Sequence, residues 1–314
     1  MSTPVVALLI VLVGFQYAAQ APINGGLGRT VGPLAAALVS FSVGATILLL
    51  ICVVSGEISS FSAIGDVPFW QLLGGAIGAS YVAIAAITIS RVGAGVIAAV
   101  TVTGQLLCSV VIDHFGWFGI EIHDVTPARV FGLVLLLVGA MAMLYSREEA
   151  TEGLDAEKGV GGMFEGGANR ERLLICVGIF LAAIAVGIQH PLNSELAGSI
   201  GDFPSGLVNF LTGLTVLTIV VVATGRWKGL GRIREAEPQY FLGGVIGVIV
   251  VVASLAAVTV IGAAGLTSAL VAGQMIGSLV LDRTGAFGLT RIPIDRIRLA
   301  AAVALLAGTF LATG

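Results

Sequence analysis

Long apolar runs, separated by short polar segments, recur along the whole chain. Each run is close to the ~20 residues that an α-helix needs to cross the hydrocarbon core of a bilayer. The runs are rich in Ala, Leu and Gly and do not alternate between apolar and polar residues, which argues against the strands of a membrane barrel. The pattern predicts an all-α membrane protein with ten transmembrane helices, at residues 4–23, 33–55, 69–90, 92–113, 128–146, 173–191, 204–224, 239–261, 263–282 and 297–313.

The second half of the chain repeats the first at one fixed distance. Gln20-Ala21-Pro22-Ile23-Asn24 returns as Gln189-His190-Pro191-Leu192-Asn193, a shift of 169 residues. The same shift relates Phe41 to Phe210, Gly74 to Gly243, Gly78 to Gly247, Gly104-Gln105 to Gly273-Gln274, and Asp113 to Asp282. A register held over this length indicates a duplicated membrane unit, and internal repeats in membrane proteins point to alternating-access transport.

The basic residues predict how the two halves lie in the membrane. If the N-terminus is outside, every Lys and Arg except Arg129 falls in a cytoplasmic segment, as the positive-inside rule requires. Five helices in each half then place the halves in opposite orientations, so we expect two inverted-topology five-helix repeats. We assign residues 1–146 to the first repeat, with its N-terminus outside. Residues 147–172 form a charged, Gly-rich cytoplasmic linker without much structure, and residues 173–314 form the second, inverted repeat, whose C-terminus is also outside.

The composition is also typical of an integral membrane protein, and it argues against several classes of function. Hydrophobic residues make up 57% of the chain and charged residues 11%, and the mean hydropathy is +1.06. The net charge of −3 gives no reason to expect a nucleic acid partner. No nucleophile with a base, metal-ligand cluster or phosphate-binding loop is evident. We therefore expect no enzyme activity, no catalytic residues, no metal site and no cofactor.

The repeated Gln-x-Pro-x-Asn segment is the first candidate for a functional site. Its Gln and Asn are four residues apart, so a helix places each pair on one face: Gln20 with Asn24, and Gln189 with Asn193. Pro22 and Pro191 lie between them and free a backbone carbonyl, which membrane proteins tolerate next to protein or a water-filled cavity. We interpret these residues as a polar substrate path or gate. The alternative is a helix that simply stops at Pro and is capped by Asn.

Further polar residues lie within or at the ends of the predicted helices. Gln105 and Gln274 should face the bundle interior, because an amide in hydrocarbon costs several kcal/mol unless it is bonded. They either bind substrate or join helices. Asp113 and Asp282 end two equivalent helices, either as solvated or Arg-paired carboxylates at a helix-exit turn or as a coupling-ion site or gate. His190 has no counterpart in the first half and is a candidate for proton coupling, or a plain polar contact.

The repeated Gln-x-Pro-x-Asn, the Gly-Gln…Asp-x-x-Gly run and the fused ten-helix layout resemble the drug/metabolite transporter superfamily. Within it they resemble a bacterial branch of five-span proteins, long filed as a domain of unknown function, that includes fused two-half members. The resemblance implies an inner-membrane carrier in which the first four helices of each half line the path and the fifth packs outside. Small multidrug relatives carry a glutamate in the first helix. Here the polar residues are Gln16 and Gln20, which argues against proton-coupled efflux of cations.

These observations favour a secondary transporter for a small polar or amphipathic metabolite in the bacterial inner membrane. We expect substrate to bind between the halves, at Gln20, Asn24, Gln105, Gln189, Asn193 and Gln274. We expect coupling or gating at His190, Asp113, Asp282, Pro22 and Pro191, with protons or sodium ions as candidate coupling ions. Two alternatives stay open. One is a flippase for lipid or lipid-linked sugar, and the other is a non-transporting membrane scaffold.

Overall fold

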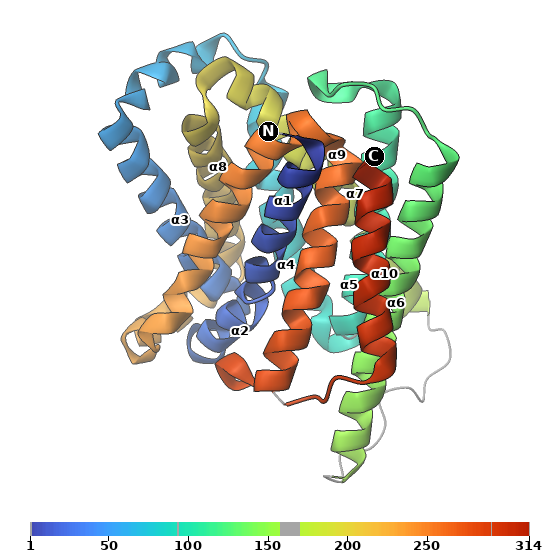
Figure 1. The fold of residues 1–314 in the computed structure, drawn as a ribbon. Coiled ribbons are helices and arrows are strands. Elements are labelled where there is room, and N and C mark those ends of the chain that lie inside the picture. The colour runs from blue at the N-terminus through green and yellow to red at the C-terminus, as the bar shows by residue number, and fades with distance from the viewer. Residues whose placement is uncertain (1, 93, 158–169, 290, 314) are drawn as a thin grey trace.

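The protein is a bundle of long α-helices in the computed structural model, which describes residues 2–92, 94–157, 170–289 and 291–313. Figure 1 shows the helices running between two ends of the bundle, with the start of α1 and the end of α10 at the same end. The first half contains α1 (Thr3–Tyr17), α2 (Gln20–Val31), α3 (Pro33–Ser55), η1 (Glu57–Gly65), η2 (Phe69–Leu73), α4 (Gly74–Val92), α5 (Ala94–Phe115), η3 (Trp117–Gly119) and α6 (Pro127–Glu157). The second half contains α7 (Arg170–Ile200), α8 (Asp202–Ala223), η4 (Arg226–Glu235), η5 (Pro238–Phe241), α9 (Leu242–Thr284), η6 (Ala286–Gly288) and α10 (Arg296–Thr313). The η elements are short 3₁₀ helices.

The helices are long and apolar enough for a membrane protein. Eight segments of the described chain have the length and hydropathy of a membrane span, and Val100–Phe115 is a shorter apolar helix. The segment Pro238–Thr284 has 47 residues, about twice what one crossing needs. The backbone of Gly262 leaves the helical region there (φ 71°, ψ 172°), so α9 bends into two arms. Two arms of α9, α5 and the seven other segments account for all ten expected passes. The bend falls between the expected helices 239–261 and 263–282.

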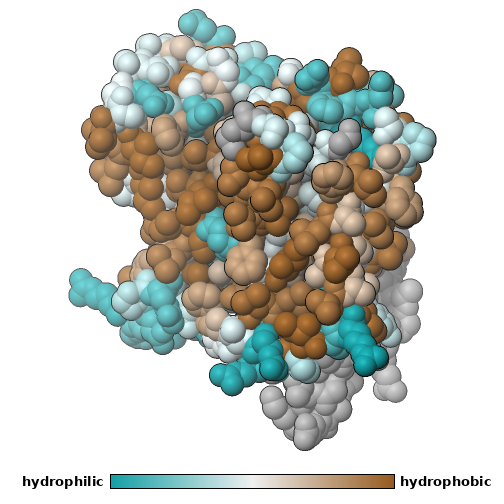
Figure 2. Space-filling model, in the orientation of Figure 1, coloured by the Kyte–Doolittle hydropathy of each residue, from teal (hydrophilic) through white to brown (hydrophobic). Residues whose placement is uncertain are grey.

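Side-chain placement on the surface agrees with a membrane setting. Figure 2 shows apolar side chains over the middle of the bundle and hydrophilic ones gathered towards its two ends. Among the exposed residues are large apolar side chains of α1 and α3, such as Leu8, Leu12 and Val54. Apolar side chains on such a helical face have a lower free energy in contact with lipid tails than in contact with water.

Backbone geometry repeats between the halves at the same spacing as the sequence. Phe118 and Phe287 both have a positive φ (58° and 56°), which is uncommon for a residue other than glycine. Gly32 and Gly201 (φ 91° and 94°) occupy the equivalent turns before α3 and α8. The duplicated sequence therefore folds into two units with the same local turns.

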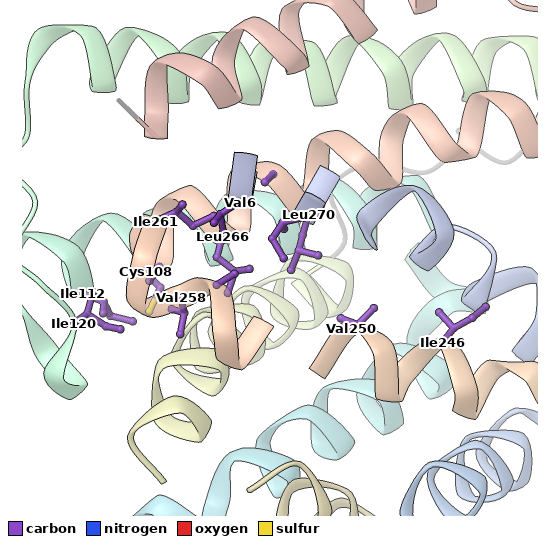
Figure 3. Close-up of a cluster of buried hydrophobic side chains, with 14 of the residues drawn as sticks. Val6, Cys108, Ile112, Ile120, Ile246, Val250, Val258, Ile261, Leu266 and Leu270 are labelled. Atoms are coloured by element: carbon purple, nitrogen blue, oxygen red, sulfur yellow. The ribbon is translucent and has the colours of Figure 1, made fainter. Parts of the chain in front are cut away.

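The helices of the two halves pack against one another throughout the bundle. The helix α1 packs against α9, α5 against α7, α3 against α8, and α6 against α10. Each of these pairs joins one half to the other. Figure 3 shows one resulting core around the bend of α9, where Val6 of α1, Cys108 and Ile112 of α5, and Ile261 and Leu266 of α9 are buried together. The position of each half is thus fixed by the other half.

Three helices extend well beyond the expected limits. One is α2, which continues past Pro22 and Asn24 to Val31 instead of ending near residue 23. The helix α6 continues to Glu157, so the first part of the expected unstructured linker is helical; the run from Arg147 contains Glu and Ala, which are good helix formers. Residues 158–169 of that linker lie outside the described part. The helix α7 runs through Pro191 to Ile200 instead of ending near residue 191. Leu196 and Ile200 are buried, and their packing holds the helix together beyond the proline.

Candidate functional site

Gln189 and Asn193 of α7 lie against a glycine-lined face of α4, in the other half of the protein. A Cβ added at Gly74 would overlap the Oδ1 atom of Asn193, and one added at Gly78 would lie 2.6 Å from the Oε1 atom of Gln189. Both amides donate to the Oδ1 atom of Asn209 on α8, at 3.0 Å from Gln189 Nε2 and 2.8 Å from Asn193 Nδ2. We call this arrangement the Asn193 contact. It gives the two polar side chains a bonded place inside the bundle, where an unbonded amide is costly.

The equivalent residues of the first half make the reciprocal contact with α9. A Cβ added at Gly243 would overlap the Oδ1 atom of Asn24, and one added at Gly247 would lie 3.1 Å from Gln20 Nε2. Gln20 Nε2 donates to the carbonyl oxygen of Gly243 at 3.0 Å, and Ser40 Oγ donates to Asn24 Oδ1 at 2.6 Å. We call this arrangement the Asn24 contact. Every residue in it corresponds to one in the Asn193 contact at the shift of 169, so the two contacts are copies at opposite positions in the fold.

The two contacts differ at one equivalent pair of positions, Ser40 and Asn209. Asn209 accepts from both amides of the Asn193 contact. Ser40 is shorter and reaches Asn24 alone, so Gln20 bonds to the backbone of α9 instead. The Asn193 contact is therefore a three-residue side-chain network. The Asn24 contact depends partly on a backbone carbonyl, which a side-chain substitution cannot remove.

Phe41 of α3 and Phe210 of α8 meet where the two halves cross. Their ring centroids are 5.4 Å apart, in a tilted arrangement. Gly44 leaves room for the ring of Phe210, and Gly213 leaves room for the ring of Phe41. The pair is related to itself by the repeat, which places it on the approximate symmetry axis between the halves.

Gln105 and Gln274 are placed differently from the other amides. Both are half-buried, and neither side chain forms a hydrogen bond within the described residues. The preceding Gly104 packs against α7 near Ala183, and Gly273 packs against α1 near Gly14. The small residues bring the helices together beside each glutamine.

Asp113 and Arg129 form a buried ion pair at the bend of α9. Asp113 Oδ1 accepts a hydrogen bond from the backbone N–H of Ala263 at 2.6 Å, and Oδ2 accepts one from Ala264 at 3.0 Å. Arg129 of α6 donates to the same carboxylate. The carboxylate thus caps the start of the second arm of α9, just after Gly262, where free N–H groups and the helix dipole favour a negative charge.

Asp282 and Arg298 form the corresponding ion pair in the second half, and both side chains are buried. Arg298 and Arg129 are equivalent under the repeat. The expected candidates for coupling or gating at Asp113 and Asp282 are therefore both paired with arginine, the plainer of the two interpretations of the sequence.

The remaining predicted site residues lie on α2 and α7. Pro22 follows the break between α1 and α2, which falls at Ala18 and Ala19, and Ala18 carries the carbonyl that this proline crowds. Pro191 is buried inside the continuous α7. His190 is half-buried and makes no hydrogen bond or ion pair with the residues that the structure describes.

Comparison with known proteins identifies the family. The sequence model of a family described as "Putative inner membrane exporter, YdcZ" matches residues 5–142 and again residues 173–311. The chain belongs to this family. The two matches also show that the family's sequence pattern occurs once in each half.

The fold of this exporter-family protein also occurs in solved structures. One, titled "Crystal structure of protein", superposes with a TM-score of 0.67 at 14% sequence identity, covering 98% of this chain and 96% of that chain. At this identity the likeness concerns the fold alone. A search of curated proteins returned no match.

Several polar residues of this exporter-family chain were not expected from the sequence. Arg129 and Arg298 could have been found, because they recur at the same shift as their aspartates. Tyr81 of α4 lies 2.8 Å from Thr101 of α5, between hydroxyl oxygens, and its equivalent in the second half is Val250. No repeat signal marks that pair, since only the first half has it. It makes the interior of the first half more polar at this point.

Proposed function

We propose that the protein is a secondary transporter that moves a small polar or amphipathic metabolite across the inner membrane by alternating access. Membership of the inner membrane exporter family supports transport in general. The observation that carries the mechanism is the pair of reciprocal contacts, in which Asn193 lies on Gly74 and Asn24 lies on Gly243. A transporter of this kind needs two equivalent closures, one for each side of the membrane.

In this proposal the Asn24 contact closes the cytoplasmic side and the Asn193 contact closes the outside. Opening either side separates one amide pair from its glycine-lined helix while the other pair stays in place. The energies of the two states are then similar, because nearly the same set of contacts is lost in each. A difference of a few kcal/mol or less between states is what allows a substrate to shift their populations.

Gln105 and Gln274 are our candidates for direct contact with substrate. They are half-buried and have no hydrogen-bond partner within the described chain, whereas Gln20, Asn24, Gln189 and Asn193 are engaged in the contacts. The latter four become available to substrate only on the side that opens. Asp113 and Asp282 hold the helices that carry this movement, and His190 is the remaining candidate for proton coupling.

A cross-linking experiment tests the two closures without knowledge of the substrate. Cys52, Cys108 and Cys176 are first replaced, and cysteines are then introduced as Gly74→Cys with Asn193→Cys, or as Gly243→Cys with Asn24→Cys. In each protein the introduced pair is first oxidised to a disulfide. A reporter, Gln105→Cys, is then labelled with a membrane-impermeant maleimide from each side. We expect labelling from the cytoplasm only when the Asn193 contact is locked, and from outside only when the Asn24 contact is locked.

Labelling of the reporter that is identical under both locks contradicts alternating access at these contacts. Ser59→Cys, on the exposed surface of η1, is the control and should react equally in all states. A screen of metabolites by thermal shift on the purified protein then seeks the substrate. If Gln105→Ala and Gln274→Ala both bind the identified ligand as tightly as the unmodified protein, these residues do not contact it.

A further inference from the structure

An apolar groove opens on the flank of α3, where η4 and η5 cross it. It encloses about 490 Å³ and is lined by Leu38, Val43 and Ile47 of α3, by Leu230 and Ile233 of η4, and by Phe241. Figure 1 shows this corner at the lower left, where the segment coloured for residues near 230 turns back beside α3. Figure 2 shows the outline of the molecule hollowed there, with apolar side chains above the hollow and hydrophilic ones below it.

The two hydroxyl residues in the groove do not make it polar. Ser42 donates to the carbonyl of Leu38 at 2.9 Å and Thr46 donates to the carbonyl of Ser42 at 2.8 Å, so both bond within their own helix. The wall that remains is hydrocarbon. Its volume lies in the range of about 300–1,000 Å³ that is typical of small-molecule sites, and its surface suits an alkyl chain.

Basic side chains gather on the helix that forms the lower edge of this groove. With about three residues per turn, η4 places Leu230 and Ile233 on one face, towards α3. Gly229 fixes that orientation, because a Cβ there would overlap the carbonyl of Val31. The other faces carry four exposed cations: Arg226, Lys228, Arg232 and Arg234. We call these four residues the basic rim.

The equivalent helix of the first half shows that the fold does not require this charge. The helix η1 has the same position in its repeat but carries Glu57, Ser59, Ala63 and Gly65 where the basic rim stands in η4. The rim faces the side that the charge distribution predicts to be cytoplasmic, where anionic lipids attract clustered Lys and Arg. The positive-inside rule requires only that basic residues lie on the cytoplasmic side. It does not require them to adjoin an apolar groove, as they do here.

We propose that the groove binds one acyl chain of an anionic phospholipid whose phosphate lies on the basic rim. Arginine and lysine supply hydrogen-bond donors and positive charge for the phosphate. The groove holds the acyl chain against the protein instead of among the surrounding lipid tails. At three residues per turn, Trp227 shares the face of Leu230 and Ile233. It is exposed, and tryptophan favours the level of the lipid headgroups. The site borders the Asn24 contact, since Val43 packs against Gly244, but it shares no residue with that contact and does not depend on the proposed transport.

Lipid binding by the intact protein tests this proposal. Native mass spectrometry in detergent is used to compare dioleoyl phosphatidylglycerol with dioleoyl phosphatidylcholine, which has the same chains and no net charge. We expect one phosphatidylglycerol to be retained with at least tenfold higher affinity. Glycerol phosphate, which has the headgroup chemistry but no chain, should not be retained.

Matched variants separate the rim from general surface charge. Arg232→Gln with Arg234→Gln should lower the affinity for phosphatidylglycerol about 25-fold, or about five-fold for each charge. Arg283→Gln with Arg296→Gln removes the same charge from exposed positions on the same predicted side and should leave the affinity unchanged. Equal binding of the two lipids, or equal loss in the two double variants, overturns the proposal.

A third variant tests the groove itself. Ser42→Phe places a ring in the groove and leaves all four cations in place. We expect it to lose the tightly bound phosphatidylglycerol while its melting temperature stays within a few degrees, because Ser42 bonds only to its own helix. Retention of the lipid by this variant shows that the groove is not the site, and the proposal fails even if the rim is important.

Discussion

The carboxylate of Asp113 at the end of α5 accepts the backbone N–H of Ala263, 150 residues later in the chain, at 2.6 Å. It thereby ties one half of the protein to the bend of the long helix in the other. The N–H groups after Gly262 would otherwise lack a partner inside the bundle, and such groups are costly away from water. Arg129 neutralises the buried charge, so cap and counterion form a single unit.

Asp113→Asn should destabilise the protein by about 3–5 kcal/mol, because it leaves the buried guanidinium of Arg129 without its counterion. The amide could still accept one backbone hydrogen bond, so the loss comes mainly from the unpaired charge. Thermal unfolding in detergent measures the effect. Asp113→Asn combined with Arg129→Leu should recover part of the loss, and a double variant less stable than Asp113→Asn alone would contradict this explanation.

Gly74→Ala should lower stability by about 1–3 kcal/mol, the usual range for added volume in a packed interior. The new methyl group would overlap the side chain of Asn193 and force the amide off Asn209. Gly178→Ala on α7 is the matched control, since an added Cβ there meets nothing within 4 Å. Helix propensity alone makes the control neutral or slightly stabilising. Equal melting temperatures for the two variants would argue against the close contact.

Ser59→Cys and Lys228→Cys should react with an impermeant thiol reagent from opposite sides of the membrane. The two residues are equivalent under the repeat, and both are exposed, on η1 and η4. The inverted arrangement predicts Ser59 outside and Lys228 in the cytoplasm. Labelling is compared in intact cells and in inverted vesicles, using protein without its three natural cysteines. Reaction of both positions from the same side would disprove the inverted orientation.

Asp295→Ala should cost about 0.5–2 kcal/mol, because Asp295 caps the start of α10 by accepting the N–H of Arg298 at 2.7 Å. A hydrogen bond from the hydroxyl of Ser146, and then this backbone bond, lower the pKa of the Asp295 carboxyl below its usual value. The stabilising contribution is thus present above the unfolded pKa of about 3.9 and is lost as the pH falls through the lower folded value.

Melting temperatures of the Asp295→Ala protein and its parent, compared between neutral and acidic pH, measure this contribution. The difference between them should be constant near neutrality and should shrink only below about pH 4. Thr126 caps the equivalent helix α6 through its hydroxyl, so Thr126→Ala should show no such pH dependence. A difference for Asp295→Ala that grows with acidity would contradict the assignment.

The sequence alone predicted the helical class and the duplication. These features follow from local hydropathy and from residues that recur at one spacing. The sequence predicted two separate helices, 239–261 and 263–282, where the structure has one helix, α9, that bends at Gly262. It did not predict that α7 continues through Pro191, because burial of Leu196 and Ile200 outweighs a local helix-breaking preference. Nor did it predict the helical start of the linker, where Glu- and Ala-rich residues before the Gly-rich segment favour a helix.

The sequence also did not predict which residues the polar side chains contact. Gln20 and Asn24 were expected to matter, but not to lie on Gly247 and Gly243. A signal was present, since the amides and the glycines share a four-residue spacing and fit one another when the helices run antiparallel. Spacing does not say which helix lies opposite, and that information comes only from the packing of the whole bundle.

The reciprocal placement of the amides also bears on how the protein is made. While the ribosome is still producing the second half, Gln20 and Asn24 have emerged but the glycines of α9 that receive them have not. Until then Ser40 can donate to Asn24 within the newly inserted first half, but the Gln20 amide lacks the carbonyl of Gly243 to which it donates in the finished fold. Synthesis of α9 supplies that carbonyl, and the two units reach their final arrangement only after α10 has followed and packed against α6.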